Sequence, residues 1–138
     1  MILSEKFLWI KEVCFNNDGL VPVIVQDYEN NKILMMAWMN QESLIKTITT
    51  GKAVYWSRSR KNLWEKGEKS GNFQIVKGLY LDCDGDTLLL IVIQYGKIAC
   101  HTGHSSCFFR KLNKKLNSET KSWIYVEPVL KKPEKIYK

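Results

Sequence analysis

Residues 100–107 carry two cysteines and two histidines within eight positions. Cysteine thiolates and histidine imidazoles are ligands that Zn²⁺ prefers in proteins. A third thiol lies upstream, so that the three follow the pattern Cys83-x16-Cys100-x6-Cys107. Structural zinc sites usually contain Cys-x2–4-Cys pairs, which this pattern lacks. Three thiols without an obvious fourth ligand favour a catalytic zinc with one position open for water. Three buried structural cysteines are the alternative.

The two histidines of this segment differ in their neighbours. His101 directly follows the candidate ligand Cys100. It is therefore interpreted either as a fourth metal ligand or as an acid–base group beside a metal-bound water. His104 is less constrained by its neighbours, and the residues alone leave its role open.

An acidic cluster precedes the apolar run of residues 88–93. Asp82, Asp84 and Asp86 alternate with Cys83 and Gly85, so in an extended chain the carboxylates share one face and the thiol takes the other. Carboxylates this close repel one another unless a cation gathers them, and oxygen ligands suit Mg²⁺ or Ca²⁺. The glycine position does not fit an EF-hand loop. The cluster therefore predicts a hard-cation site, with a solvated acidic turn as the alternative.

A third group of candidate residues lies in the basic stretch of residues 52–77. Arg58 and Arg60 alternate with serines, and Trp64, Lys66 and Ser70 follow. Guanidinium groups match phosphate oxygens, hydroxyls and glycine amides add donors, and an indole stacks on a base. These residues are therefore candidates for binding a phosphorylated nucleotide. An exposed polar loop without a ligand is the alternative.

The elements that must position these groups are mostly strands. Asn40 is expected to cap a helix over residues 41–50, and Gly51 to end it. Residues 58–72 are expected to form a long loop, and the prolines at 128 and 133 mark an irregular C-terminal part. Alternating and apolar runs predict strands at residues 20–26, 32–39, 53–57, 73–81 and 87–94, and weaker ones at 106–112 and 123–126.

Length and composition limit the class of protein. A chain of 138 residues with 45% hydrophobic residues fits one globular domain over residues 1–138. No apolar run is long enough to span a membrane, and the first residues do not resemble an export signal. We therefore expect a reducing, cytoplasmic location, where clustered cysteines bind metal or react. Cys14, far from the others, is expected to be a small buried apolar residue.

The net charge of +7 first suggests nucleic acid as a partner. The charge is not spread evenly, however, because residues 52–77 and residues 111–138 hold the basic excess and the remainder is acidic. Scattered lysines near the C-terminus are typical of a solvated surface. A zinc-stabilised nucleic-acid-binding module therefore remains only an alternative, and the acidic cluster argues against it.

Several motifs together carry a family resemblance, namely residues 34–40, 57–60, 63–67, 70–71, 82–86, 99–103 and 106–108. On these motifs the chain resembles the phosphoribosyl-AMP cyclohydrolase family of histidine biosynthesis over about residues 13–112. The resemblance implies a strand-dominated, compact α+β domain with one or two short helices, which forms an intertwined homodimer. It also implies zinc bound by Cys83 of one subunit with Cys100 and Cys107 of the other, and Mg²⁺ bound by the acidic cluster.

The reaction that the resemblance implies is hydrolysis of the N1–C6 bond in the adenine ring of 1-(5-phosphoribosyl)-AMP, which gives a formimino-carboxamide ribonucleotide. His101 would move the proton, and Arg58, Arg60 and Lys66 would hold the two phosphates. Where the family has a basic residue after His-Thr-Gly, this chain has His104, which makes it a candidate substrate contact. Residues 113–138 are expected to be a loose basic extension. An inactive relative that serves as a scaffold is a further alternative.

Overall fold

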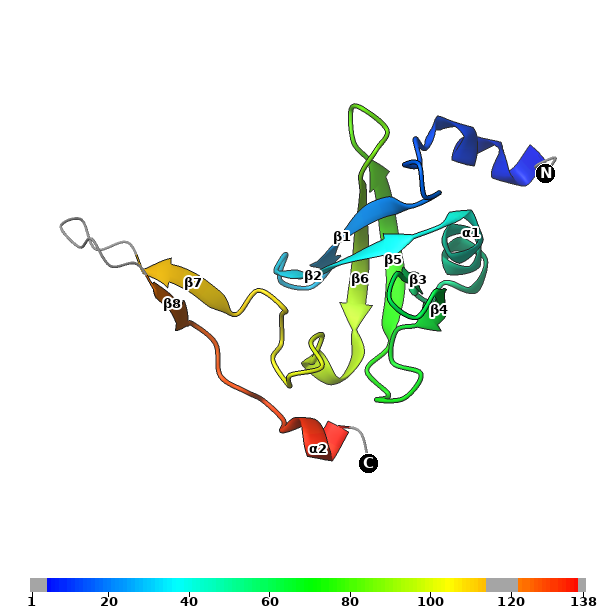
Figure 1. The fold of residues 1–138 in the computed structure, drawn as a ribbon. Coiled ribbons are helices and arrows are strands. Elements are labelled where there is room, and N and C mark those ends of the chain that lie inside the picture. Colours follow the sequence, from blue (N-terminus) through cyan, green and yellow to red (C-terminus); the bar gives the residue numbers. More distant parts are fainter. Residues whose placement is uncertain (1–4, 114–121, 137–138) are drawn as a thin grey trace.

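The computed structural model describes residues 5–113 and 122–136. Its centre is a four-stranded sheet in the order β2-β1-β6-β5 (Figure 1). The hairpin of β1 (Val21–Asp27) and β2 (Ile33–Met39) lies beside the hairpin of β5 (Gln74–Leu81) and β6 (Leu88–Gln94). Strands β1 and β6 join the two hairpins by parallel pairing, whereas the pairs within each hairpin are antiparallel. The strands expected in this part of the chain are confirmed to within a residue or two.

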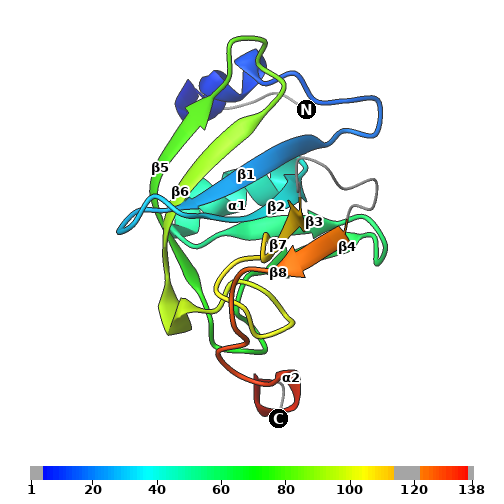
Figure 2. The ribbon, with the colours of Figure 1, turned by 90° about the vertical axis from the view of Figure 1, so that its left-hand side faces the viewer.

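Alternation of apolar residues along the two central strands builds the core. Val23 and Val25 of β1 are fully buried, and they pair in register with Leu88 and Leu90 of β6. Burial of such side chains contributes about 1.5–3 kcal/mol each. Figure 2 shows the helix α1 (Gln41–Thr50) behind β1 and β2, and Leu44 of this helix is fully buried in the same core cluster.

Helix α1 begins and ends at the residues that its sequence specifies. The Asn40 side chain accepts a hydrogen bond from the Ser43 amide at 2.8 Å, and the Ser43 hydroxyl accepts one from the Asn40 amide at 2.9 Å. This reciprocal pair is a capping box. At the other end, Gly51 has a left-handed φ of 76° and its amide bonds to Thr47. The expected helix is therefore confirmed with both of its caps.

The expected loop at residues 58–72 contains a strand. Strand β4 (Asn62–Glu65) pairs antiparallel with β3 (Val54–Ser57), and the rings of Tyr55 and Trp64 lie 5.1 Å apart. The prediction of a continuous loop was wrong because Leu63 and Trp64 bury apolar surface only when β3 is present beside them. Those two residues contain too short a pattern to signal a strand by themselves.

The C-terminal part confirms the strand expected at residues 123–126 and adds a short helix that was not expected. Strand β7 (Arg110–Asn113) pairs with β8 (Ser122–Tyr125) in a hairpin that projects from the sheet (Figure 1), and α2 (Pro133–Ile136) follows. The strand expected at 106–112 starts only at Arg110, because the Ser106 hydroxyl and the Cys107 amide bond to carbonyl groups of β2 instead. Residues 1–4 lie outside the described residues, as do residues 114–121 and 137–138 of the expected extension.

Two short 3-10 helices complete the described structure, η1 (Glu5–Glu12) and η2 (Tyr95–Lys97). Cys14, just after η1, is exposed, so the prediction that it is buried was wrong. The amide of Cys14 bonds to the Gly85 carbonyl at 2.7 Å, which holds this residue against a surface turn instead of in the core. Within the described ranges, no helix has the length and apolar content that a membrane span requires.

Candidate active site

The thiols of Cys100 and Cys107 lie together in the segment between η2 and β7, which we call the thiol loop (residues 98–109). The Cys107 thiol lies close enough to Cys100 to lower the pKa of Cys100. Cys100 in turn, together with burial, raises the pKa of Cys107. The two thiols therefore form an interacting pair in which Cys100 is the more acidic member.

Lys66 brings a positive charge to this pair. Lys66 follows directly after β4 in the chain, and its ammonium group donates a hydrogen bond to the Ala99 carbonyl. Burial lowers the pKa of Lys66, while the negative charge of the two cysteines acts in the opposite direction. The sequence predicted Lys66 as a phosphate contact, but the structure places it beside the thiols, where a cation favours the thiolate form.

Hydrogen bonds from a serine and a backbone amide fasten the thiol loop to the main sheet. The Ser106 hydroxyl donates to the Ile33 carbonyl at 2.7 Å, and the Cys107 amide donates to the Leu34 carbonyl at 2.7 Å. These bonds reach across from the first two residues of β2, so the sheet sets the position of the Cys107 thiol.

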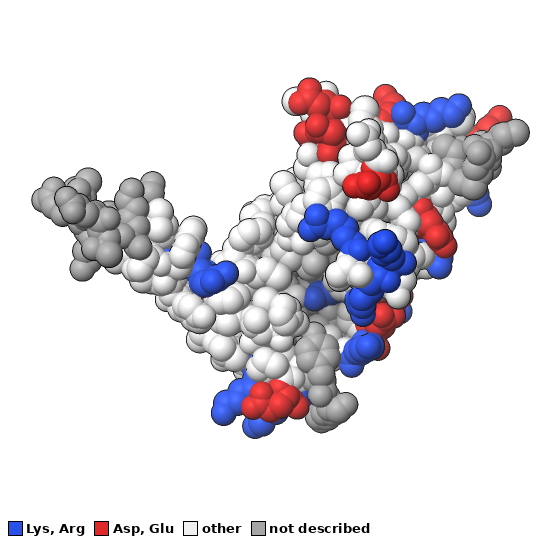
Figure 3. All heavy atoms as spheres, in the orientation of Figure 1, with Lys and Arg blue, Asp and Glu red and all other residues white. Residues whose placement is uncertain are grey.

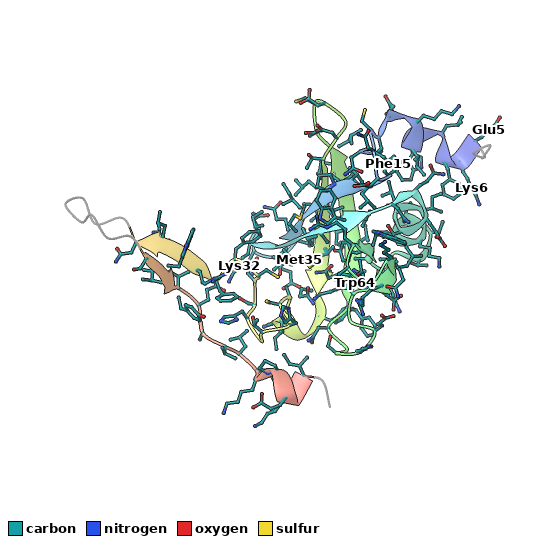
Figure 4. The ribbon with its side chains drawn as sticks, viewed as in Figure 1. Glu5, Lys6, Phe15, Lys32, Met35 and Trp64 are labelled. Carbon is teal, nitrogen blue, oxygen red and sulfur yellow. The ribbon has the colours of Figure 1, made fainter. Side chains whose placement is uncertain are left out.

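The C-terminal segment (residues 126–132) holds the other side of the thiol loop. The Leu130 amide donates to the Gly103 carbonyl at 2.8 Å. Glu127 forms an ion pair with Lys32, which lies at the end of β2 nearest the β7–β8 hairpin (Figure 4), and it accepts a hydrogen bond from the Ser105 hydroxyl at 2.7 Å. The expected loose extension is therefore, in its described part, a support for the site.

The two histidines occupy different environments. His101 is exposed and close enough to Cys100 that its charge lowers the pKa of that thiol. An exposed imidazole beside the thiol pair is free to exchange protons with a substrate. His104 is only 2% exposed, and this burial does not favour the predicted contact with a substrate.

The acidic turn (residues 82–87) brings three carboxylates together at the tip of the β5–β6 hairpin. Oxygen atoms of Asp82, Asp84 and Asp86 all lie within 4.8 Å of one another, and all three residues are exposed. Figure 3 shows this acidic tip at the top of the molecule. Hydrogen bonding to Asp82 and repulsion from it raise the pKa of Asp86. A turn, and not the extended chain that the alternation suggested, gathers the three oxygens.

Cys83 lies in the acidic turn, at the opposite end of β6 from the thiol loop (Figure 1). The seven residues of β6 span roughly 20 Å at the usual rise of a strand. Among the described residues of one chain, only the three aspartates bring three metal-binding side chains within 4.8 Å. One copy of the chain therefore does not bring its three predicted zinc ligands together.

Most of the predicted nucleotide-binding residues line one cleft. A cavity of about 190 Å³ is bordered by Arg60, Trp64, Lys66 and Ser70, among others. Arg58 lies elsewhere, with its guanidinium 4.7 Å from the centre of the Trp38 ring. The structure therefore brings four of the five basic-loop candidates together and separates the fifth.

Several residues of the site were missed by sequence reasoning. The Thr102 hydroxyl donates to the Cys100 sulfur at 2.9 Å, and its place two residues after a candidate ligand was a usable signal. Lys32 and Glu127 support the thiol loop from distant positions, and nothing in the local sequence around either residue predicts their pairing.

The site combines a thiol pair, a neighbouring ammonium group, an exposed histidine and a basic cleft. This combination is typical of an enzyme active site and argues against a nucleic-acid-binding module.

The family model for phosphoribosyl-AMP cyclohydrolase matches residues 35–109. Phosphoribosyl-AMP cyclohydrolases of Bordetella avium and Bordetella petrii are 60% and 59% identical over 130 residues, which cover 94% of this chain and 96% of each relative. The relative from Nitrosomonas eutropha is 57% identical over 129 residues, 94% of this chain and 95% of its own. The chain belongs to this family and is a hydrolase.

Proposed function

We propose that this chain hydrolyses the N1–C6 bond in the adenine ring of 1-(5-phosphoribosyl)-AMP, in the biosynthesis of histidine. The relatives' shared name supplies the substrate. The observation in this chain that supports the proposal best is the pair of interacting thiols beside Lys66, a residue that also lines the cleft with Arg60 and Ser70.

The thiol pair fits a bound zinc ion. A soft dication would replace the thiol protons and bind both sulfur atoms. We infer that Cys83 of a second copy of the chain supplies the third sulfur, because the Cys83 of the same chain lies at the far end of β6. Zinc, when bound, polarises the substrate and lowers the pKa of water. On this proposal the site forms only in a homodimer.

His101 is the group proposed to move the proton. Water adds to C6, the bond between C6 and N1 breaks, and N1 receives a proton as it leaves. An exposed imidazole next to Cys100 can accept the proton of the attacking water and deliver one to N1. Arg58 and Arg60 remain the proposed phosphate contacts, because their side chains are exposed and carry the bidentate donors that phosphate requires.

The acidic turn is the proposed Mg²⁺ site. Its three exposed carboxylates repel one another, as the raised pKa of Asp86 indicates, and a hard dication relieves this repulsion. Because Cys83 lies between Asp82 and Asp84, a zinc site shared between subunits brings this turn next to the thiol loop of the partner. The two metals would then border one active site.

An absorbance assay with 1-(5-phosphoribosyl)-AMP tests this proposal. The purified chain should turn over the substrate with zinc and Mg²⁺ present, and a chelator should stop the reaction. His101→Ala should keep its zinc but lose about 10²- to 10⁴-fold in kcat. No turnover with both metals supplied would favour an inactive scaffold. Near-normal turnover of the His101 variant would instead remove only that residue from the mechanism.

A further inference from the structure

His104 is a buried side chain that the proposed reaction does not use. Its ring stacks on Phe109 with the centroids 3.6 Å apart and the planes 3° from parallel. The ring of Tyr125 packs edge-on against it, with the centroids 6.2 Å apart. These contacts fix the plane of the imidazole. Because the residue is only 2% exposed, a dissolved substrate does not reach it, and its role must be exerted through its neighbours.

One of those neighbours connects His104 to a sulfur atom of the thiol pair. The Nδ1 atom of His104 lies 2.7 Å from the Thr102 hydroxyl, and that hydroxyl donates to the Cys100 sulfur at 2.9 Å. A threonine hydroxyl has a single proton to donate. If the sulfur receives it, the imidazole must be the donor to the threonine oxygen, and Nδ1 must carry a hydrogen.

The other ring nitrogen agrees with this assignment. Nε2 of His104 is buried and has no hydrogen-bond partner among the residues that the structure describes. The opposite tautomer would place an N–H group at Nε2, where it would be a buried donor without an acceptor, which is rarer and more costly than an unused acceptor. Both nitrogens therefore favour the tautomer with its hydrogen on Nδ1.

We propose that His104 is a positioning residue for Cys100, which acts through Thr102 by donating its Nδ1 hydrogen and so fixing the threonine hydroxyl as a donor to the sulfur. This inference rests on the proposed role of Cys100 as a zinc ligand. A hydrogen bond held in this direction keeps the sulfur lone pairs oriented before the metal arrives, which raises metal affinity in the way that neighbours of a ligand usually do.

The first test uses the unmodified chain, with and without zinc. Long-range ¹H–¹⁵N correlation spectra report which imidazole nitrogen carries the hydrogen. We expect Nδ1 of His104 to be protonated and Nε2 to be bare in both forms. A spectrum with the hydrogen on Nε2 would overturn the proposal, whatever the variants below show.

The second test measures zinc affinity by competition with a chromogenic chelator. Thr102→Val and His104→Phe, which remove the hydroxyl and the ring donor but preserve shape and stacking, should each weaken binding about 10- to 100-fold. Thr102→Ser and His104→Asn restore a donor at nearly the same place and should recover most of the affinity. The double variant Thr102→Val/His104→Phe should bind zinc with about the affinity of the weaker-binding single variant, because both changes break the same chain of hydrogen bonds.

The outcomes separate this proposal from the proposed zinc site. Full zinc retention in Cys100→Ser would show that the ligand assignment itself is wrong. Loss of zinc in Cys100→Ser with unchanged affinity in Thr102→Val and His104→Phe would overturn only the role of His104. Additive losses in the double variant, or no recovery in His104→Asn, would show that His104 does not act through Thr102.

Discussion

The two ends of β6 differ in their exposure to solvent, in the type of metal-binding atom they carry and in the contacts that hold them. The acidic turn at its start is exposed, carries only oxygen ligands beside Cys83, and is held mainly by hydrogen bonds among its own residues. The thiol loop at its end contains buried polar groups, two adjacent sulfur atoms and hydrogen bonds from distant parts of the chain. On the proposed function, the hard-cation half of the site is therefore assembled locally, whereas the soft-cation half depends on the tertiary structure.

At each end of β6, nevertheless, a glycine leaves space for the close approach of a backbone segment from near one terminus of the chain. Gly85 has a φ of 74°, and a side chain there would meet the Glu12 carbonyl at 2.7 Å. Gly103 has a φ of 90°, and a side chain there would collide with the Lys131 carbonyl. Gly85 and Gly103, which have no reactive side chain, therefore help to position each half of the site.

The strongest test of the comparison asks whether the two halves come from different subunits. Cys83→Ser and Cys100→Ser chains should each be inactive by themselves. When they are mixed, unfolded and refolded together, each heterodimer should contain one site with all three thiols. Random pairing then restores about one quarter of wild-type activity, because half of the dimers have one intact site of two. No recovery after verified heterodimer formation would contradict a shared site.

The two glycines offer a test with effects of intermediate size. Gly103→Ala should reduce the free energy of unfolding by about 2–4 kcal/mol and weaken zinc binding, because left-handed strain adds to the collision with residue 131. Gly85→Ala should cost a similar amount but weaken Mg²⁺ binding instead. Denaturant titrations and metal titrations measure both effects.

Gly19→Ala is the matched control for this pair. Gly19 has a φ of 74°, but no atom within 4 Å of the position that a side chain would take. It should lose only the strain of about 1–2 kcal/mol and keep both metals. Equal losses in all three variants would show that the terminal segments do not matter.

A smaller effect is expected for a single charge in the acidic turn. Asp84→Asn should raise the Mg²⁺ concentration needed for half-maximal activity by about 10-fold, because the hard cation loses one ligand. Without Mg²⁺ its stability should stay within about 0.5 kcal/mol of wild type, since surface substitutions usually change little.

Asp82→Asn provides the contrast to this variant. The Asp82 carboxylate accepts hydrogen bonds from the amides of Asp86 and Thr87, at 3.0 and 3.3 Å. Its substitution should therefore destabilise the turn even when Mg²⁺ is absent. Metal-free stabilities that do not distinguish the two variants would contradict the proposed division between binding and folding roles.

The smallest effect concerns the ion pair that supports the thiol loop. Its partner Lys32, and a hydrogen bond from Ser105, lower the pKa of Glu127 below its ordinary value of 4.5. A folded-state pKa below the unfolded one gives stability that is present above pH 4.5 and is lost as the pH falls through the folded value. Glu127→Gln should therefore cost up to about 1 kcal/mol at neutral pH and progressively less in acid. A stability difference that is independent of pH between 7 and 3 would contradict this.

Local signals allowed the sequence to predict the parts of this molecule that local interactions determine. Asn40 and Gly51 mark the ends of α1 because their capping bonds stay within four residues. The acidic turn was found because its ligands are neighbours in the chain. The proximity of Cys100 and Cys107 was also suggested by their spacing, although the spacing could not show that each thiol shifts the pKa of the other.

Predictions failed where distant segments decide the outcome. The exposure of Cys14 depends on its bond to Gly85, and the burial of His104 depends on Phe109 and Tyr125. The structure around residues 126–132 depends on Gly103 and Lys32, almost a hundred positions away in the second case. Lysine-rich composition described the surface of that segment and not the backbone bonds that hold it.

The bond between Leu130 and Gly103 also bears on the order in which a growing chain acquires its parts. The acidic turn and its support at residues 12–14 emerge from the ribosome well before residue 130 does. A chain released early by premature termination, for example near residue 125, would thus present its oxygen ligands but lack the final support of its thiol loop. On the proposed function, such fragments would bind zinc more weakly than chains whose synthesis has passed this point.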